Sequence, residues 1–267
     1  MEDNLLLNSF LQLLETHCGI ERVRQIESGG DGAALWDAIE ESGFSDALVP
    51  ESTGGAGLGL EDIFPLVIAS GEHLLPAPLA ETMIARAVLH LKGGDVPKGS
   101  LTLAQAGIVA PEAAAAITAA LMAGAMQRVF DMTLSYANDR TQFGKPIGKF
   151  QAVQHQLSVL AEHVFAVRIA AQLAFAGLGP LPDELKAAAA KARASEAVPI
   201  VTSIAHAVHG AIGITEEYDL QLYTRRLIAW RLMHGGEQYW QKRLGESLLA
   251  SGQDMLPFIC NHIFTKV

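Results

Sequence analysis

The stretch NDRTQFGKPIGKFQ, residues 138–151, joins two long apolar segments and is unusually rich in side chains suited to recognition. Most helix–helix connections are simply polar. Here the guanidinium of Arg140 offers a planar fork of donors that fits a phosphate group. Gln142 and Gln151 can bond to amide or sugar groups, and Gly144 permits a tight turn. The residues alone leave two interpretations open: a phosphate-binding turn, or a helix-breaking loop with one surface arginine.

The segments on both sides of this stretch predict a helical bundle. Residues 113–137 are apolar nearly all round, which is typical of a central buried helix. Residues 153–176 carry apolar side chains at steps of four and three, which predicts an amphipathic helix. A third helix is expected over 183–209, kinked or interrupted by Pro199, and a last helix is expected from near Glu237. Long antiparallel helices with short connections are typical of a four-helix bundle.

The first 92 residues predict a second group of shorter helices. Apolar patterns separated by glycine and proline breaks indicate helices over 5–14, 20–26, 33–42, 60–73 and 79–91. The glycine-rich run STGGAGLG, residues 52–59, lacks the Lys-Ser/Thr ending of a phosphate-binding P-loop and the preceding strand of a dinucleotide-binding fold. A phosphate-binding loop is therefore not expected there.

The predicted fold class is all-α. It comprises an N-terminal helical domain over 1–92, a short linker over 93–110 and a C-terminal four-helix bundle over 111–267. The linker contains the run GGDVPKGS and has room for at most one short strand, over 101–104.

The composition argues against several classes of function. Half of the 267 residues are hydrophobic and 18% are charged, as expected of a well-packed globular protein. The net charge of -10 argues against nucleic-acid binding, because nucleic-acid binders present a basic face. Cys18 and Cys260 lie far apart without C-x-x-C spacing, so neither a disulfide framework nor a metal site is expected. No signal peptide and no uncharged apolar run long enough to span a bilayer is recognised, so a cytoplasmic location is expected.

The run RTQFGKPI at 140–147, followed by Phe150, Gln151 and Gln154, resembles the C-terminal signature of the acyl-CoA dehydrogenases. In that family the turn reaches across a subunit interface to the pyrophosphate and adenosine side of a neighbour's FAD. The resemblance implies FAD as cofactor, an acyl-CoA as substrate and an oligomer. A looser resemblance to the family's N-terminal helical domain covers 33–91. The signature residues implied to bind the cofactor are Arg140, Gln142, Phe143 and Gln151.

A second block, VHGAIGITEEY at 208–218, resembles the family's Gln-x-His-Gly-Gly-x-Gly block, although the family's glutamine falls on Ala207 and its second glycine on Ala211. In the family this region packs against the adenine–ribose end of the flavin cofactor, again between subunits. The residues implied to bind there are His209, Gly210 and Gly213. The alternative role for His209 is a packed or capping histidine beside a glycine turn.

Two departures from the family concern catalysis. The family's β-sandwich domain, which contacts the flavin ring and the thioester, would fall at 93–110, where this chain has a short linker. The family's glutamate base falls on His234, and the base position used by other members falls on Ala114. An imidazole titrates near neutral pH and can accept a proton. The alternative is a histidine tolerated where catalysis was lost.

Two functions follow from this resemblance. The first is FAD-dependent α,β-dehydrogenation of an acyl-CoA thioester, in lipid or steroid catabolism. The chain would then be one subunit of a homo-oligomer, or of a heteromer whose partner, a β-domain-containing family member, supplies the β domain and the base. The second is a non-catalytic scaffold or ligand-binding module derived from the family. The retained Arg140 favours the first function, whereas the missing β domain and His234 favour the second.

Overall fold

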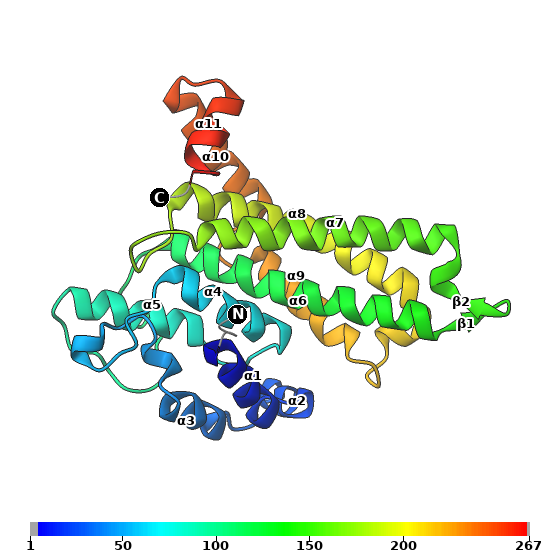
Figure 1. Ribbon diagram of the computed structural model, residues 1–267, viewed down its shortest axis with the longest axis horizontal. Helices are drawn as coiled ribbons and strands as arrows, with labels where there is room; N and C mark the ends of the chain where they lie inside the picture. The colour runs from blue at the N-terminus through cyan, green and yellow to red at the C-terminus, as the bar shows by residue number, and fades with distance from the viewer. Residues whose placement is uncertain (1–4, 266–267) are drawn as a thin grey trace.

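The chain is almost entirely helical, as the computed structural model in Figure 1 shows for residues 5–265. The expected all-α fold class is confirmed. The shorter helices of the N-terminal part are α1 (Leu5–His17), α2 (Ile20–Glu27), α3 (Ala33–Glu41), α4 (Leu60–Glu72) and α5 (Leu79–Leu91), with 3-10 turns η1 (Phe44–Asp46) and η2 (Glu51–Thr53). The C-terminal part comprises α6 (Pro111–Asp139), α7 (Gln151–Ala174), α8 (Glu184–His209), α9 (Leu220–Leu232), α10 (Glu237–Ser251) and α11 (Met255–His262).

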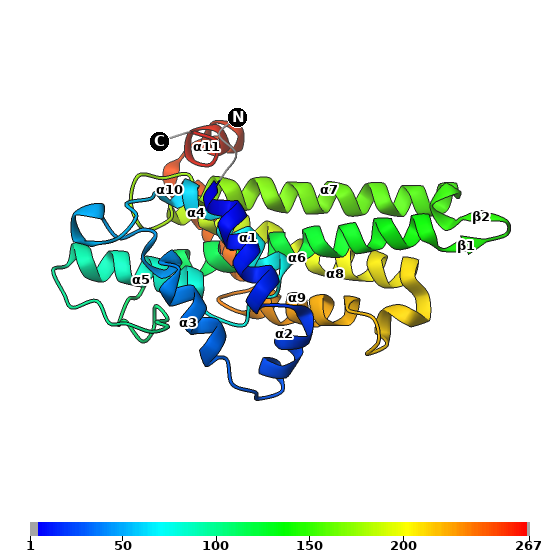
Figure 2. The ribbon, with the colours of Figure 1, turned by 60° about the horizontal axis from the view of Figure 1, so that its bottom comes forward.

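Three long helices, α6, α7 and α8, pack on one another, and α9 and α10 pack beside them (Figures 1 and 2). Helix α6 starts with Pro111 at its first turn, where a missing N–H costs nothing. Of the kink or interruption expected at Pro199, the interruption is wrong, because α8 continues through this residue. Pro199 lies on the exposed face of α8, so its ring meets solvent, while Val198 and Val201 beside it are buried and hold the helix in the bundle.

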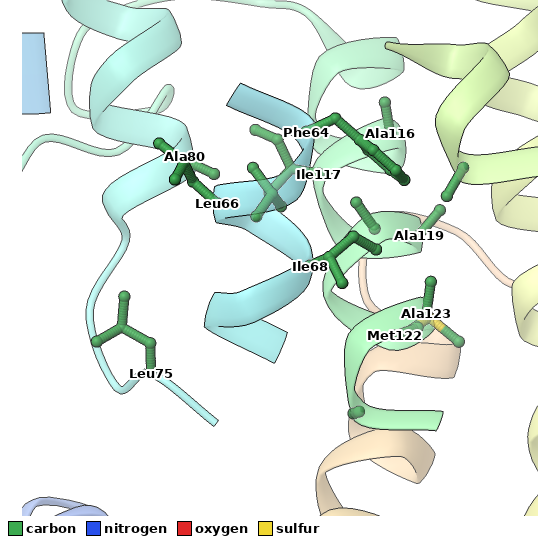
Figure 3. Close-up of a cluster of buried hydrophobic side chains, with 14 of the residues drawn as sticks. Phe64, Leu66, Ile68, Leu75, Ala80, Ala116, Ile117, Ala119, Met122 and Ala123 are labelled. Carbon is green, nitrogen blue, oxygen red and sulfur yellow. The ribbon is translucent and has the colours of Figure 1, made fainter. Parts of the chain in front are cut away.

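The N-terminal helices share a continuous hydrophobic core with the bundle through the contact between α4 and α6. Figure 3 shows Phe64 and Ile68 of α4 facing the small side chains of α6, among them Ala119 and Ala123. Alanines let two helix backbones approach closely, which is why an Ala-rich segment forms the central helix. The division into two domains stays a prediction, but α4 is the element that joins the two parts.

The linker between α5 and α6 forms no strand within the described residues. Some of its backbone donors bond to one another's carbonyls in turns, and two bond to side chains of α5. Leu101 N–H donates to Thr82 Oγ1 at 3.0 Å, and Leu103 N–H donates to Glu81 Oε2 at 3.0 Å. Both acceptors belong to α5, so the linker is fixed along that helix and not paired in a sheet.

The expected absence of a membrane-spanning segment is not confirmed. Three stretches, Pro111–Asp139, Gln151–Ala174 and Glu184–Ile214, are long and apolar enough to cross a membrane by length and composition alone. In the first of them, 72% of the most apolar 18-residue window is buried inside the protein, whereas the figure for the second is 28%. Helix α7 therefore leaves much of its apolar surface uncovered, including Phe165 and Ile169.

Candidate functional site

The signature stretch forms a short β-hairpin that projects from one end of the bundle (Figure 1). Its strands β1 (Thr141–Gln142) and β2 (Lys145–Pro146) pair antiparallel, with Gln142 opposite Lys145. The two residues at its tip have positive φ, +51° for Phe143 and +78° for Gly144, as in a tight two-residue hairpin turn. Phe143 is 92% exposed. An exposed aromatic side chain on a strained backbone is typical of a recognition site.

Arg140 lies between α6 and the hairpin. Its backbone N–H and carbonyl are hydrogen-bonded within the chain, whereas its side chain has no partner there. Its N–H donates to Tyr136 O at 2.9 Å, and its carbonyl accepts from Ile147 N–H at 2.8 Å. Its guanidinium has no hydrogen bond and no ion pair with any residue of the described part of the chain. The side chains of Gln142 and Gln151 are also exposed. The turn thus presents solvent-facing donors that have no protein partner, an arrangement that suits an anion site.

His209, by contrast, is built into the chain's own packing. It is 3% exposed, and its ring stacks on Tyr136 with centroids 4.5 Å apart. Nδ1 lies 2.8 Å from Ala205 O, which can only accept, so Nδ1 carries the proton. Nε2 lies 3.3 Å from the Tyr218 hydroxyl and accepts from it. Burial lowers the pKa of His209, so the ring is neutral at neutral pH.

The glycines that follow His209 have structural roles in the 3-10 turn η4 (Gly210–Ile214). Gly210 ends α8 at φ +65°. A Cβ at Gly213 would lie 3.0 Å from His209 Cβ and 3.1 Å from a methyl of Leu220, so the turn packs too closely for a side chain. The structure brings this block to the same end of the bundle as Arg140, because Tyr136 contacts both: its carbonyl bonds to Arg140, and its ring stacks on His209.

A separate cavity of about 250 Å³ lies among the α4–α5 connection, α6 and the turn after α9. Both positions at which the family carries its base, His234 and Ala114, line this cavity. Its other walls combine the apolar Leu75, Ile117 and Trp230 with the polar Glu81 and Arg226. None of the cofactor-binding residues predicted from the sequence lines it. The predicted site residues thus fall into two groups, one at the hairpin end and one at the cavity.

His234 occupies a constrained turn between α9 and α10. Its own φ is +57° and that of Gly235 is +96°. A Cβ at Gly235 would lie 2.8 Å from Trp240 Nε1, so only glycine fits there. Trp240 Nε1–H donates to His234 O at 3.0 Å, which fixes the turn from the α10 side. Burial lowers the pKa of His234, and the nearby Glu81 opposes part of that shift.

Lys191 fixes the same turn from the α8 side. Its side chain is fully buried, and Nζ donates to Gly235 O at 2.8 Å, to Arg231 O at 3.0 Å and to Ser195 Oγ at 2.8 Å. All three ammonium protons are therefore used. Burial lowers the pKa of Lys191 to about 8, and the charge of Glu237 opposes this shift. The ammonium lies at the C-terminal end of α9, where the helix dipole favours a cation.

Replacing Lys191 with methionine is expected to destabilise the chain by about 2 kcal/mol, because Gly235 O, in a partly buried turn, would lose its ammonium donor. Arg231 O would keep its hydrogen bond from the Ser195 hydroxyl. Urea unfolding of the two proteins measures the difference. Lys242→Met on the exposed surface of α10 is the matched control and should change the free energy of unfolding by less than about 0.5 kcal/mol. Equal stability of Lys191→Met and wild type would contradict the assigned role.

Lys191 and Glu81 were missed by sequence reasoning. A signal for Lys191 existed, since it shares one face of α8 with Ala187, Ala194 and Val198, all of which are buried. Glu81 lies in the first turn of α5, where an acidic residue is usual. Its place at the cavity depends on how α5 packs, and local sequence does not encode that.

Comparison with known proteins identifies the family. The family model for the acyl-CoA dehydrogenase C-terminal domain matches residues 112–249. The acyl-CoA dehydrogenase IpdE2 of Mycolicibacterium smegmatis is 30% identical, over 84% of this chain and 92% of that protein. Two solved structures share the fold. A variant of the Tcur3481-Tcur3483 steroid ACAD has a TM-score of 0.76 at 23% identity, covering 94% of this chain and 98% of that one. The ChsE4-ChsE5 complex from Mycobacterium tuberculosis has a TM-score of 0.77 at 18% identity, covering 93% and 98%. Because the family model matches more than half of the chain and the relative aligns along most of it, the chain belongs to the acyl-CoA dehydrogenase family.

Proposed function

We propose that this chain is one subunit of an FAD-dependent enzyme that dehydrogenates the α,β-bond of an acyl-CoA thioester. The observation that carries the proposal is the Arg140 turn, which keeps a guanidinium unpaired in solvent on a rigid hairpin. A scaffold protein would have no need of a strained turn that presents a guanidinium without a protein partner. The alternative, a non-catalytic module derived from the family, is favoured by His234 at the family's base position and by the short linker at 93–110.

The residues at the hairpin fit the pyrophosphate and adenosine side of FAD. Arg140 has free donors for a phosphate, Gln142 and Gln151 are exposed, and Phe143 presents an open aromatic face. His209 fits less well, because both of its ring nitrogens already have partners in this chain. We therefore assign the cofactor contact chiefly to the hairpin, with Gly210 and Gly213 shaping the surface beside it. The flavin supplies the hydride acceptor when it is bound.

We infer that the chain assembles with a different subunit, a family member that contains the β domain. In one solved neighbour, ChsE4 and ChsE5 form a complex, and another neighbour is a steroid ACAD. The uncovered apolar face of α7, with Phe165 50% and Ile169 57% exposed, is suited to burial in such an assembly. The proposed substrate is an acyl-CoA thioester from lipid or steroid breakdown, and the proposed location is the cytoplasm. The proton-accepting base comes either from the partner or from this chain's own cavity.

The proposal is tested by co-purifying the chain with a β-domain-containing family member and measuring acyl-CoA-dependent reduction of an artificial electron acceptor. Activity is expected in the complex and absent from the chain alone. A complex that binds FAD but turns over no acyl-CoA of any chain length would contradict the dehydrogenase function.

Arg140→Ala should weaken FAD binding to that complex by about 10- to 100-fold, because a charge-assisted phosphate contact contributes about 1.5–3 kcal/mol. Fluorescence titration with FAD measures the dissociation constant. Lys149→Ala is the control, because it removes an exposed cation from η3 (Ile147–Lys149), close to the hairpin. This variant is expected to change the dissociation constant for FAD by less than about threefold. Equal losses in both variants would mean that general charge, and not the Arg140 fork, attracts the cofactor.

A further inference from the structure

We propose that Glu81 is the carboxylate that accepts the α-proton of the acyl thioester in the cavity beside His234. The inference rests on the dehydrogenase function proposed above and names the source of its base. Among the residues that line this cavity in the described part of the chain, Glu81 is the only carboxylate. It comes from α5, whereas the two family base positions belong to α6 and to the turn after α9.

The carboxylate of Glu81 is held so that one oxygen stays available. Oε2 accepts the N–H of Leu103 at 3.0 Å. Oε1 has no hydrogen-bond partner among residues 5–265. Leu103 belongs to the short linker that stands where the family has its β domain, so the segment left in place of that domain fixes the orientation of Glu81. A base whose rotamer is held by a hydrogen bond from a neighbouring segment is pre-organised for proton transfer.

The surroundings also suit a base. The cavity walls combine apolar side chains, among them Leu75, Ile117 and Trp230, with polar ones, so an acyl chain and a proton-accepting group can both be accommodated. The other ionisable residues that line the cavity are His234 and Arg226, and Arg226 is paired with Glu27. Glu81 is therefore the acidic side chain available at this cavity.

The proposed step is a simple proton transfer. The α-carbon–hydrogen bond of the thioester breaks, its proton moves to Glu81 Oε1, and the electron pair is left as an enolate delocalised onto the thioester oxygen. If no hydride leaves, the proton returns from Glu81 to the α-carbon. After exchange of the carboxyl proton with D₂O, a deuteron returns instead. This exchange requires no oxidant, so it can be measured separately from dehydrogenation.

The test uses the flavin-containing complex with its partner in D₂O and 3,3-dimethylbutanoyl-CoA, whose β-carbon carries no hydrogen. Mass spectrometry follows deuterium entering the α-carbon. Glu81→Gln is the decisive variant, because its amide oxygen can still accept the Leu103 N–H while the base is lost. Exchange is expected to fall at least 100-fold, within the range for removal of a general base. The melting temperature should stay within about 2 °C of wild type, since the structural hydrogen bond is kept.

Glu61→Gln, at the exposed start of α4, is the matched control and should exchange at the wild-type rate. Exchange by Glu81→Gln within twofold of wild type would overturn the proposal. The proposal would also be overturned if His234→Gln lost exchange while Glu81→Gln kept it, since the imidazole would then be the base. A wild-type complex that holds FAD but shows no exchange would also overturn it, whereas a complex without FAD would count against the proposed function itself.

Discussion

Replacing Gly124 with alanine is expected to destabilise the chain by about 3 kcal/mol, at the upper end of the range for overpacking. A Cβ at this position of α6 would lie 2.0 Å from Ile68 O and 2.9 Å from Glu72 N of α4. These are backbone atoms, so no side-chain rotation relieves the clash. The reciprocal contact is equally tight, because a Cβ at Gly71 would lie 2.2 Å from Leu121 O. Helix α4 would have to move away from α6.

Thermal unfolding measures this effect, with an expected fall in melting temperature of roughly 6–12 °C for a chain of this size. Gly245→Ala is the control, because Gly245 lies inside α10 and a Cβ added there would meet nothing within 4 Å. That change should stabilise the chain by about 0.5–1 kcal/mol, since alanine favours a helix over glycine. Two variants of equal stability would mean that α4 and α6 do not cross as closely as described.

Arg86→Met is expected to cost about 3 kcal/mol, the lower end of the range for breaking a buried ion pair, because Glu40 and Asp46 are partly exposed. The Arg86 side chain is 2% exposed and donates to both carboxylate oxygens of Glu40, at 2.8 and 2.9 Å. It also donates to Asp46 Oδ1 at 2.9 Å and to Gly99 O at 3.0 Å. It thus joins α5 to α3, η1 and the linker. Its loss would leave two carboxylates without their cation.

Chemical denaturation of Arg86→Met measures this loss. Arg86→Lys should recover only part of it, since one ammonium cannot reproduce the planar fork. Arg22→Met is the control, because Arg22 bonds to Asp31 O and Gln25 at the surface, and it should change stability by less than about 0.5 kcal/mol. An Arg86→Met protein as stable as the control would contradict the network.

The helices were predictable from sequence because burial of one face imposes a 3.6-residue period, and glycine and proline mark the ends. Residues 79–91, for example, form α5 as expected. The interruption expected at Pro199 was wrong, because the local cost of a proline in a helix is outweighed by burial of the flanking Val198 and Val201. The sequence could also have pointed to the α4–α6 crossing, since Gly71 and Gly124 are isolated glycines inside helices.

The candidate site divides in the same way. The turn between α6 and α7 was predictable, because glycine and proline mark a local break and Arg140, Gln142 and Phe143 are neighbours in the chain. The cavity was not, because its walls come from separate segments and Glu81 lies far before His234 in the chain. Counting along the family signature placed His234 and Ala114, and the structure adds that they line one cavity. Only tertiary packing shows that Glu81 joins them.

We propose that this chain helps to hold FAD at an interface with a β-domain-containing partner. The most direct measurement is the visible absorbance spectrum of the purified protein after incubation with FAD and removal of free ligand, for the chain alone and for the co-expressed complex. Flavin bands at near-stoichiometric level are expected in the complex and not in the chain alone. A complex that forms but stays colourless would contradict the claim and favour a non-catalytic module.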